Sequence, residues 1–286
     1  MSVLSVPVAP DVTLRVRHRP GDAEPPFLLV HGLGSNARLW DEVAGRLNAE
    51  GHPVYAVDQR GHGESDAPDD GYDTATAVAD LAAAAGGLGL RGAVVAGHSW
   101  GGNVSVRLAA QHPELVRGLA LVDGGWITLS ASCDSWEEFA SRYGVRELTG
   151  VTARSMRVYW RKIHPDWSDA AIEASLADLR ERPDGTLERR LPAARHMSVM
   201  HSMWTEPPSR WFPDIAVPVM LMPAVTTYAP RAERVRSWVA AVAAALPEAT
   251  VREYVGGDHD LHAQRPDRVA ADLLELAASV RRVRRP

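Results

Sequence analysis

The chain has 286 residues and a net charge of −5, with 45% hydrophobic and 23% charged residues. This length suits one large α/β domain or one domain with an insertion. The negative charge argues against a nucleic-acid-binding protein, which normally has a basic face. A single cysteine, Cys133, excludes an intrachain disulfide. There is no apolar run as long as a membrane span and no signal-peptide pattern, so we expect a cytoplasmic protein without membrane contact.

The first third of the chain predicts alternating strands and helices. Short alternating segments within residues 2–18 predict an antiparallel hairpin. Apolar runs at Phe27–Val30 and Val54–Asp58 predict two buried strands. Each of these runs leads into a glycine-containing polar loop, at residues 31–35 and 58–65. Helices are expected after these loops, from Asn36 as N-cap to Leu47 and from about Thr74 to Ala85.

The stretch from Val94 to Gly102 predicts a strand, a tight turn with Ser99 at its tip, and a helix. Gly97 and Gly101 flank the serine at the positions where a side chain would collide with the neighbouring strand and helix. A turn of this kind raises the serine hydroxyl above the edge of the sheet, beside a helix N-terminus. The alternative is a chance G-x-S-x-G pattern, but the strand and helix on either side favour a nucleophile.

The alternation of strands and helices stops after a predicted strand at Val116–Val122, which ends at Asp123. Helical spacing without a clear parallel strand follows, near residues 136–148, 152–163, 168–182 and 187–204. Alternation resumes with strands near 217–222 and 250–255 and helices near 231–246 and 266–281. We therefore predict a core of residues 1–125 and 213–286, with residues 126–212 as a helical cap over the carboxyl edge of the sheet.

These motifs resemble the α/β-hydrolase superfamily, in the branch of capped esterases, epoxide hydrolases and haloalkane dehalogenases. His31-Gly32 looks like the oxyanion loop of the family, and residues 58–65 are similar to its D-x-R-G-x-G-x-S loop. Gly257-Asp258-His259 looks like its late histidine loop. The resemblance implies a mostly parallel eight-stranded sheet with helices on both faces. Serine at position 99, where the epoxide hydrolases and dehalogenases have aspartate, favours acyl transfer.

The acidic member of a catalytic triad is the weakest point of the resemblance. The family usually places an aspartate after the seventh strand, but the corresponding loop here, Met222–Tyr228, has no carboxylate. Asp123 follows the sixth strand, where some haloalkane dehalogenases have their acid, and we predict it as the triad acid. Glu233, on the following predicted helix, is a less favoured alternative, and a Ser-His dyad stays open. An aspartate that only caps a loop would also suit position 123.

His259 is the predicted general base, because the Gly256-Gly257 turn precedes it. His262 lies one helical turn away and is the alternative base, although a supporting or surface position suits it better. A metal bound by these two histidines would lack a clear third ligand, so we predict neither a metal nor a cofactor. We expect Asp58, Arg60 and His62 to have structural roles.

The proposed chemistry is hydrolysis of a carboxylic ester through an acyl-enzyme. Ser99, His259 and Asp123 would form the triad, and the N–H groups of Leu33 and Trp100 would bind the oxyanion.

Tryptophan is concentrated in the cap, at positions 126, 136, 160, 167, 204 and 211. Most of these rings are expected to pack the cap, but some should line a pocket for a small apolar or aromatic substrate. The predicted substrate-binding residues are Trp40, Trp126, Trp160 and Trp204.

Two other classes of function remain open. One is a C–C bond hydrolase, lactonase or thioesterase with the same triad. The other is a non-hydrolytic ligand receptor, lyase or cyclase on this fold. The sequence does not indicate an oligomeric state or a macromolecular partner.

Overall fold

An eight-stranded sheet forms the centre of the computed structural model, which describes residues 1–246 and 248–282. The strand order is β1-β2-β4-β3-β5-β6-β9-β11. β2 pairs antiparallel with β1 and β4, and the remaining pairs are parallel. The prediction of a mostly parallel eight-stranded sheet is therefore confirmed. The strands are β1 (Ser2–Ala9), β2 (Val12–Arg19), β3 (Phe27–Val30), β4 (Val54–Asp58), β5 (Ala93–His98), β6 (Val116–Val122), β9 (Val219–Met222) and β11 (Ala249–Val251).

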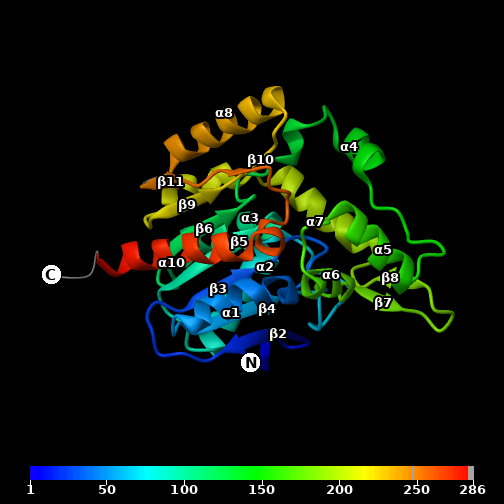
Figure 1. Cartoon of the computed structure of the whole chain (residues 1–286), viewed down its shortest axis with the longest axis horizontal. Coiled ribbons are helices and arrows are strands. Elements are labelled where there is room, and N and C mark those ends of the chain that lie inside the picture. The colour runs from blue at the N-terminus through cyan, green and yellow to red at the C-terminus, as the bar shows by residue number, and fades with distance from the viewer. Residues whose placement is uncertain (247, 283–286) are drawn as a thin grey trace.

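The sheet is buried on both faces because its central strands are largely apolar, and β3 and β9 are apolar at every position. In β3, Phe27 and Leu29 join one core cluster while Leu28 and Val30 join the other. Helices cover both faces, as Figure 1 shows. The first cluster is completed by α1 (Asp41–Ala49) and α10 (Pro266–Arg282), and the second by α2 (Thr74–Gly87), α3 (Trp100–Gln111) and α8 (Ala229–Ala245). In the described ranges, no helix is both long and apolar enough to cross a bilayer.

The segment between β6 and β9 gathers at one side of the sheet, toward the right of Figure 1. Its elements are η2 (Leu129–Ala131), α4 (Trp136–Tyr143), α5 (Ala153–Ile163), α6 (Asp169–Leu176), β7 (Leu179–Glu181), β8 (Leu187–Arg189), α7 (Ala193–Thr205) and η3 (Pro208–Asp214). Side chains of Ser135, Thr152 and Ser168 cap α4, α5 and α6.

Two of the helices predicted for this segment are wrong in their extent. Residues 179–189 form an antiparallel hairpin, β7–β8, where we predicted the end of one helix and the start of another. Pro183-Asp184-Gly185 makes the turn, with Gly185 at φ +80°. Pro192 then precedes α7, because proline suits a helix start and not a helix interior.

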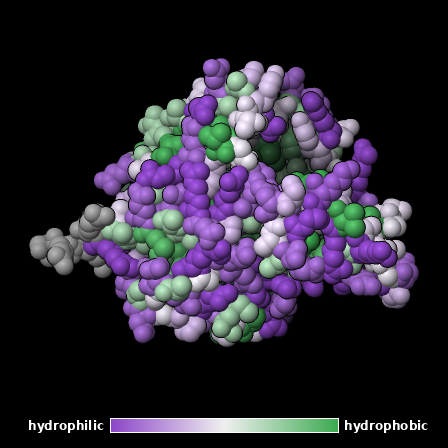
Figure 2. Space-filling model, in the orientation of Figure 1, coloured by the Kyte–Doolittle hydropathy of each residue, from purple (hydrophilic) through white to green (hydrophobic). Residues whose placement is uncertain are grey.

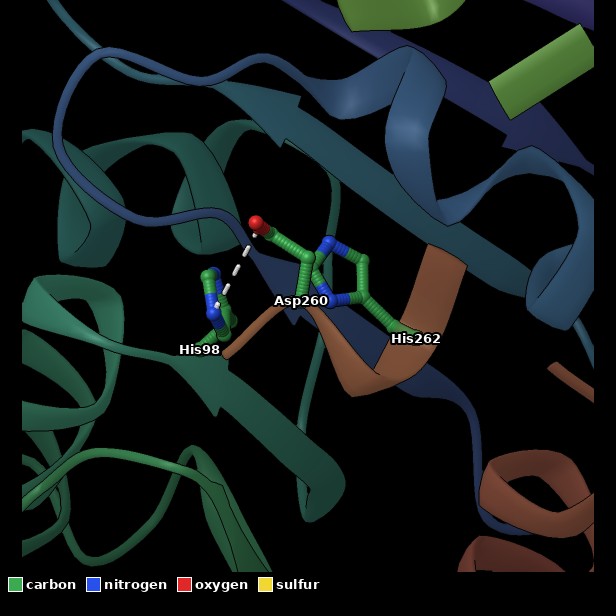
Figure 3. Close-up of side chains that lie close together, drawn as sticks. All are labelled: His98, Asp260 and His262. Atoms are coloured by element: carbon green, nitrogen blue, oxygen red, sulfur yellow. Dashed lines mark ion pairs between the residues drawn. The ribbon is translucent and has the colours of Figure 1, made fainter. Parts of the chain in front are cut away.

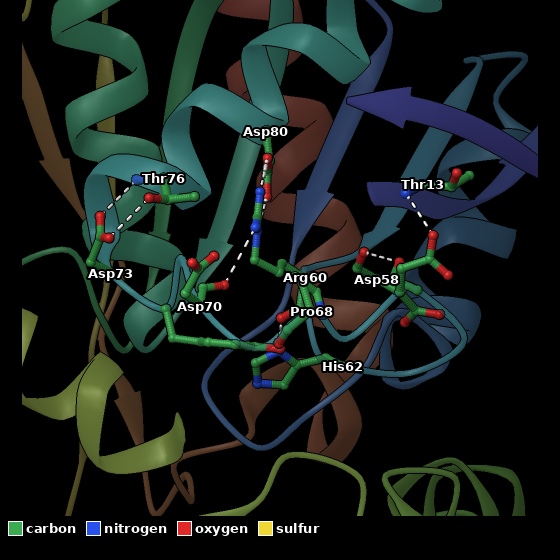
Figure 4. Close-up of polar contacts among 12 residues, drawn as sticks. Thr13, Asp58, Arg60, His62, Pro68, Asp70, Asp73, Thr76 and Asp80 are labelled. Carbon is green, nitrogen blue, oxygen red and sulfur yellow. Dashed lines mark hydrogen bonds and ion pairs between the residues drawn. The ribbon is translucent and has the colours of Figure 1, made fainter. Parts of the chain in front are cut away.

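The loop after β4 is held by its own polar side chains. The Asp58 carboxylate accepts the N–H groups of Ala37 at 2.7 Å and Glu64 at 3.0 Å, so it positions two backbone segments. Arg60 reaches from this loop to Asp80 on α2, as Figure 4 shows. Both of its hydrogen bonds to the Asp80 carboxylate measure 2.8 Å. The contacts of Asp58 and Arg60 match the structural roles expected for them.

Breaking the Arg60–Asp80 pair should destabilise the fold strongly. The two side chains are 11% and 6% exposed, so Asp80→Asn would leave a buried guanidinium without its counter-ion. The expected loss is about 3–5 kcal/mol of unfolding free energy, measured by denaturant titration. Asp22→Asn is the control, because Asp22 is exposed and should tolerate the change. Equal stability of the two variants would contradict this prediction.

Candidate active site

Ser99 stands at a strained turn between β5 and α3. Its backbone has φ 52° and ψ −123°, a conformation that non-glycine residues rarely adopt. A Cβ on Gly97 would lie 2.4 Å from the carbonyl oxygen of Gly101, and one on Gly101 would lie 2.3 Å from that of His31. Both glycines are therefore required for steric reasons, as the elbow pattern predicts.

Asp123 follows β6 and also has a positive φ, 42°. The next residue, Gly124, packs against the serine turn, since a Cβ there would lie 2.2 Å from the carbonyl oxygen of Ser99. The Asp123 carboxylate accepts two hydrogen bonds. Its Oδ1 accepts the N–H of Ala224 at 2.9 Å, and its Oδ2 lies 2.6 Å from Nδ1 of His259. This is the distance expected between a triad acid and its histidine.

His259 lies in the loop between β12 (Tyr254–Val255) and α9 (Leu261–Gln264), and its side chain is half-exposed. Because Nδ1 faces Asp123, Nε2 is the ring nitrogen left to accept a proton. Burial lowers the pKa of His259, but the hydrogen bond and charge of Asp123 outweigh this effect, with help from Asp260 and Asp258. As a result, the pKa of His259 is raised above its ordinary value of 6.5.

Ser99 and His259 line the same cavity, of about 140 Å³. Leu33 lines it as well, in a loop that passes so close to the serine that a Cβ on Gly32 would lie 2.9 Å from the Ser99 Cβ. Within the described ranges, the Leu33 N–H donates no hydrogen bond. The Trp100 N–H is at the first position of α3, where an amide has no partner inside the helix. The two predicted oxyanion donors thus lie next to Ser99 with unused N–H groups.

Two histidines hold the loop of residues 31–35 against the loop of residues 58–65. Nε2 of His62 accepts the N–H of Gly34 at 3.2 Å, and Nε2 of His31 accepts the N–H of Gln59 at 3.0 Å. Burial lowers the pKa of both imidazoles, to about 4 for His62, so they stay neutral acceptors at neutral pH. Gly34 has φ +67°, which favours glycine at that position.

His262 is fully buried and does not line the cavity of Ser99. Its ring stacks on Trp40 at 4.3 Å and lies 4.5 Å from the His98 ring. This position does not suit the alternative role of His262 as a base for Ser99, and it is not a surface position. Trp40 is fully buried as well, in the core beside α1, because its ring packs under His262. The predicted substrate contact of Trp40 is therefore wrong.

His98, Asp260 and His262 form a group whose potential metal-binding atoms lie within 4.8 Å of one another (Figure 3). The structure thus brings two further side chains to His262, which the sequence did not indicate. However, Nε2 of His98 lies 2.9 Å from the carbonyl oxygen of His259, so this nitrogen is a donor there. Its other nitrogen, Nδ1, faces Gly32, where a Cβ would lie 3.0 Å away. The His98 nitrogen nearest Asp260, at 3.7 Å, is therefore the one that already donates to a backbone carbonyl.

The other predicted tryptophans lie in three different places. Trp160 lines both the cavity of Ser99 and a larger neighbouring one of about 610 Å³ in the cap. Trp126 lines a separate cavity of about 620 Å³ that includes Asp123 and His259. Trp204 packs against Trp136 and Phe139, and it lines none of these cavities. Figure 2 shows a hollow with apolar side chains between α8 and α4.

Two acidic residues near the site were not predicted. Asp258 accepts hydrogen bonds from His164 and Trp167 of the cap, each at 2.9 Å, and so ties the cap to the loop of His259. Asp178 follows α6 and lines both the 140 Å³ and the 610 Å³ cavities. Asp178 lies inside the helix predicted for residues 168–182, where an aspartate resembles a solvated residue. The alternative acid Glu233 is exposed on α8.

Among curated proteins, the chain is similar to 2-(acetamidomethylene)succinate hydrolase of Mesorhizobium japonicum, with 38% identity over 112 residues. That match covers 39% of each chain, so it spans well under half the length of the relative. A match to epoxide hydrolase A of Mycobacterium tuberculosis has 29% identity over 195 residues and covers 62% of this chain and 59% of the relative.

Solved structures show the same fold over nearly the whole chain. The structure of E-2-(acetamidomethylene)succinate hydrolase superposes with a TM-score of 0.78 at 23% identity and covers 96% of this chain and 98% of the other. A thioesterase domain from the curacin biosynthetic pathway superposes with a TM-score of 0.74 at 18% identity, with coverage of 96% and 99%. The family profile described as "Alpha/beta hydrolase family" matches residues 27–272, which include Ser99, Asp123 and His259. The chain belongs to the alpha/beta hydrolase family.

Proposed function

We propose that this chain is a serine hydrolase that cleaves an acyl bond of a small, largely apolar substrate through an acyl-enzyme. The observation that carries the proposal is the 2.6 Å contact between Asp123 and His259, with Ser99 on the same cavity as that histidine. These observations support a triad in the chain order Ser99, Asp123, His259, with each residue on a separate loop. A carboxylic ester is the first candidate substrate.

The proposed reaction has two steps. His259 Nε2 takes the proton of Ser99 Oγ while this oxygen attacks the acyl carbon, and the histidine then gives the proton to the leaving group. The N–H groups of Leu33 and Trp100 receive the oxyanion, and each such donor typically contributes about 3–4 kcal/mol in the transition state. Water, deprotonated by His259, then attacks the acyl-enzyme, and Ser99 recovers its proton.

An amide is the second candidate substrate, because a similar curated protein is named as a hydrolase of an acetamido compound. Thioesters also remain in the proposed range, since a similar fold belongs to a thioesterase domain. A matched panel of 4-nitrophenyl esters, thioesters, lactones and anilides with common acyl groups tests the proposal. Turnover of at least one class is expected. No turnover of any class, together with ligand binding, would favour a non-hydrolytic receptor.

The proposed base predicts a specific pH dependence. His259 must be neutral to accept a proton, so kcat/KM should fall as the pH decreases through its pKa. Because this pKa is raised above 6.5, the acid limb should have its midpoint above pH 6.5. The measurement is the pH profile of kcat/KM for the wild type, with circular dichroism at each pH as the control for folding. A midpoint below pH 6.5 in the folded protein would contradict the role of Asp123 in raising this pKa.

A further inference from the structure

The Asp178 carboxyl lies where the cavity of Ser99 meets the larger cavity in the cap. The two cavities share Gly34, Trp160, Ser175 and Asp178. Asp178 is only 6% exposed, and its Oδ2 lies 3.9 Å from the position that a Cβ would take on Gly34, in the oxyanion loop. The carboxyl is therefore next to the proposed reaction site, in a place that a bound substrate would reach.

Among the residues that the structure describes, none forms a hydrogen bond with this carboxyl. Its Oδ1 is fully buried and unpartnered within the described part of the chain. Arg189 lines the larger cavity, but its buried Nε is unpartnered too, and no ion pair joins the two side chains. Ser175, the other shared polar residue, donates its hydroxyl to the carbonyl oxygen of Ala171. Because an unsatisfied buried carboxyl destabilises a fold, its presence on a cavity wall indicates a ligand.

The protonation state of Asp178 and the charges near it limit the class of ligand that can bind here. Burial raises the pKa of Asp178 to about 8, although Arg189 and Arg190 act against this shift and Asp58 adds to it. The two arginines disfavour a bound cation, and the Asp178 carboxyl, which is mainly protonated at neutral pH, keeps an oxygen that can accept a hydrogen bond. A neutral N–H or O–H group is the remaining donor that the carboxyl oxygen can accept in either protonation state.

The residues that line the two cavities indicate the chemical character of the rest of the ligand. The larger cavity is lined mainly by apolar side chains, which are Leu148, Val151, Met156, Tyr159, Trp160 and Leu179. The cavity at Ser99 is much smaller, at about 140 Å³ against about 610 Å³. A substrate that fits both would have a short polar part at Ser99 and an apolar remainder in the cap.

We propose that Asp178 is a specificity-determining residue that accepts a hydrogen bond from an amide N–H or a hydroxyl group a few bonds from the scissile carbonyl. The substrate class is then an acyl compound with such a donor and an apolar tail. This inference rests on the proposed function, because it places the donor beside the carbonyl that Ser99 attacks.

Three 4-nitrophenyl esters, two of them isosteric, separate the effect of the hydrogen-bond donor from effects of size and polarity. The 3-hydroxybutanoate has a donor, the 3-methoxybutanoate has only an acceptor, and the 3-methylbutanoate has neither. We expect the wild type to prefer the hydroxy ester over the methyl ester at least about tenfold in kcat/KM, because a site that accepts a donor discriminates against analogues lacking it. In Asp178→Leu the preference should disappear. In Asp178→Asn, which keeps the shape and one acceptor oxygen, it should fall several-fold.

The thermal stability of the same variants provides a second measurement. Since Asp178→Leu removes an unsatisfied buried carboxyl, its Tm should equal or exceed that of the wild type. Asp184→Asn, on the exposed turn of β7–β8, is the control and should keep the preference for the hydroxy ester. If the preference survives in a folded Asp178→Leu variant, the inference is wrong. If this variant does not fold, an unchanged preference in Asp178→Asn would equally overturn it.

A binding measurement separates this inference from the proposed function. Calorimetry with Ser99→Ala compares N-phenyl-3-hydroxybutanamide with N-phenyl-3-methylbutanamide, neither of which needs to react. Tighter binding of the hydroxy amide, with loss of that advantage in Ser99→Ala/Asp178→Leu, would support the role of Asp178 even if no ester is hydrolysed. Equal binding of both amides to Ser99→Ala would overturn it.

Discussion

Ser99→Ala should lower kcat by about 10⁶-fold, the scale observed when a triad nucleophile is removed. Without Oγ no acyl-enzyme can form, and only the oxyanion donors and the binding site remain to accelerate the reaction. The variant should stay folded, because alanine experiences the same backbone strain at φ 52° as serine does. The measurement is steady-state kinetics on the best ester of the panel, with circular dichroism and Tm to verify folding.

Ser198→Ala provides the matched control for that experiment. Ser198 is exposed on α7, donates its hydroxyl to the carbonyl oxygen of Ala194 and does not line the cavity of Ser99. The activity of the Ser198→Ala variant should be close to that of the wild type. Retention of substantial activity in a folded Ser99→Ala variant would end the proposal of a Ser99 nucleophile.

Asp123→Asn should lower kcat by up to about 10⁴-fold and leave the fold intact. Asn can still accept the Ala224 N–H through its Oδ1, but it then presents an N–H₂ group to Nδ1 of His259. That contact favours the tautomer with the proton on Nε2, which cannot accept the serine proton. Kinetics on the same ester, with Tm as the stability measurement, would give the effect.

Glu233→Gln is the comparison for Asp123→Asn, because Glu233 is the other carboxylate considered from the sequence. It is exposed on α8, so the variant should have nearly normal activity. Near-normal activity in Asp123→Asn would instead indicate a Ser-His dyad. A large loss in Glu233→Gln would mean that the acid comes from α8.

The sheet and the three proposed catalytic residues were predictable because they depend on local patterns. Short apolar runs define buried strands, and the polar residue that ends such a strand lies at the carboxyl edge. Ser99 and Asp123 both directly follow strands, β5 and β6, that pair with each other. Their positive φ values then follow from the flanking glycines, which let the two turns pack together.

The parts that were not predictable depend on packing between distant segments. A buried tryptophan and a pocket tryptophan look alike in sequence, and only the stacking of Trp40 on His262 decides between them. Asp178 lies just after α6, where the chain returns from the hairpin β7–β8 and the Arg190 N–H donates to the Asp178 carbonyl oxygen. The arginine- and glutamate-rich sequence of this hairpin resembles an exposed helix. Nothing in the chain order indicates that Asp178 would share a cavity with Ser99.

Mass spectrometry after reaction with a fluorophosphonate tests the central claim most directly, because this reagent forms a stable adduct with an activated serine. We expect one adduct per chain, located on the peptide that contains Ser99. We also expect no adduct in Ser99→Ala and a much slower reaction in Asp123→Asn. Absence of the adduct from the folded wild type, or its location on another residue, would contradict Ser99 as the nucleophile.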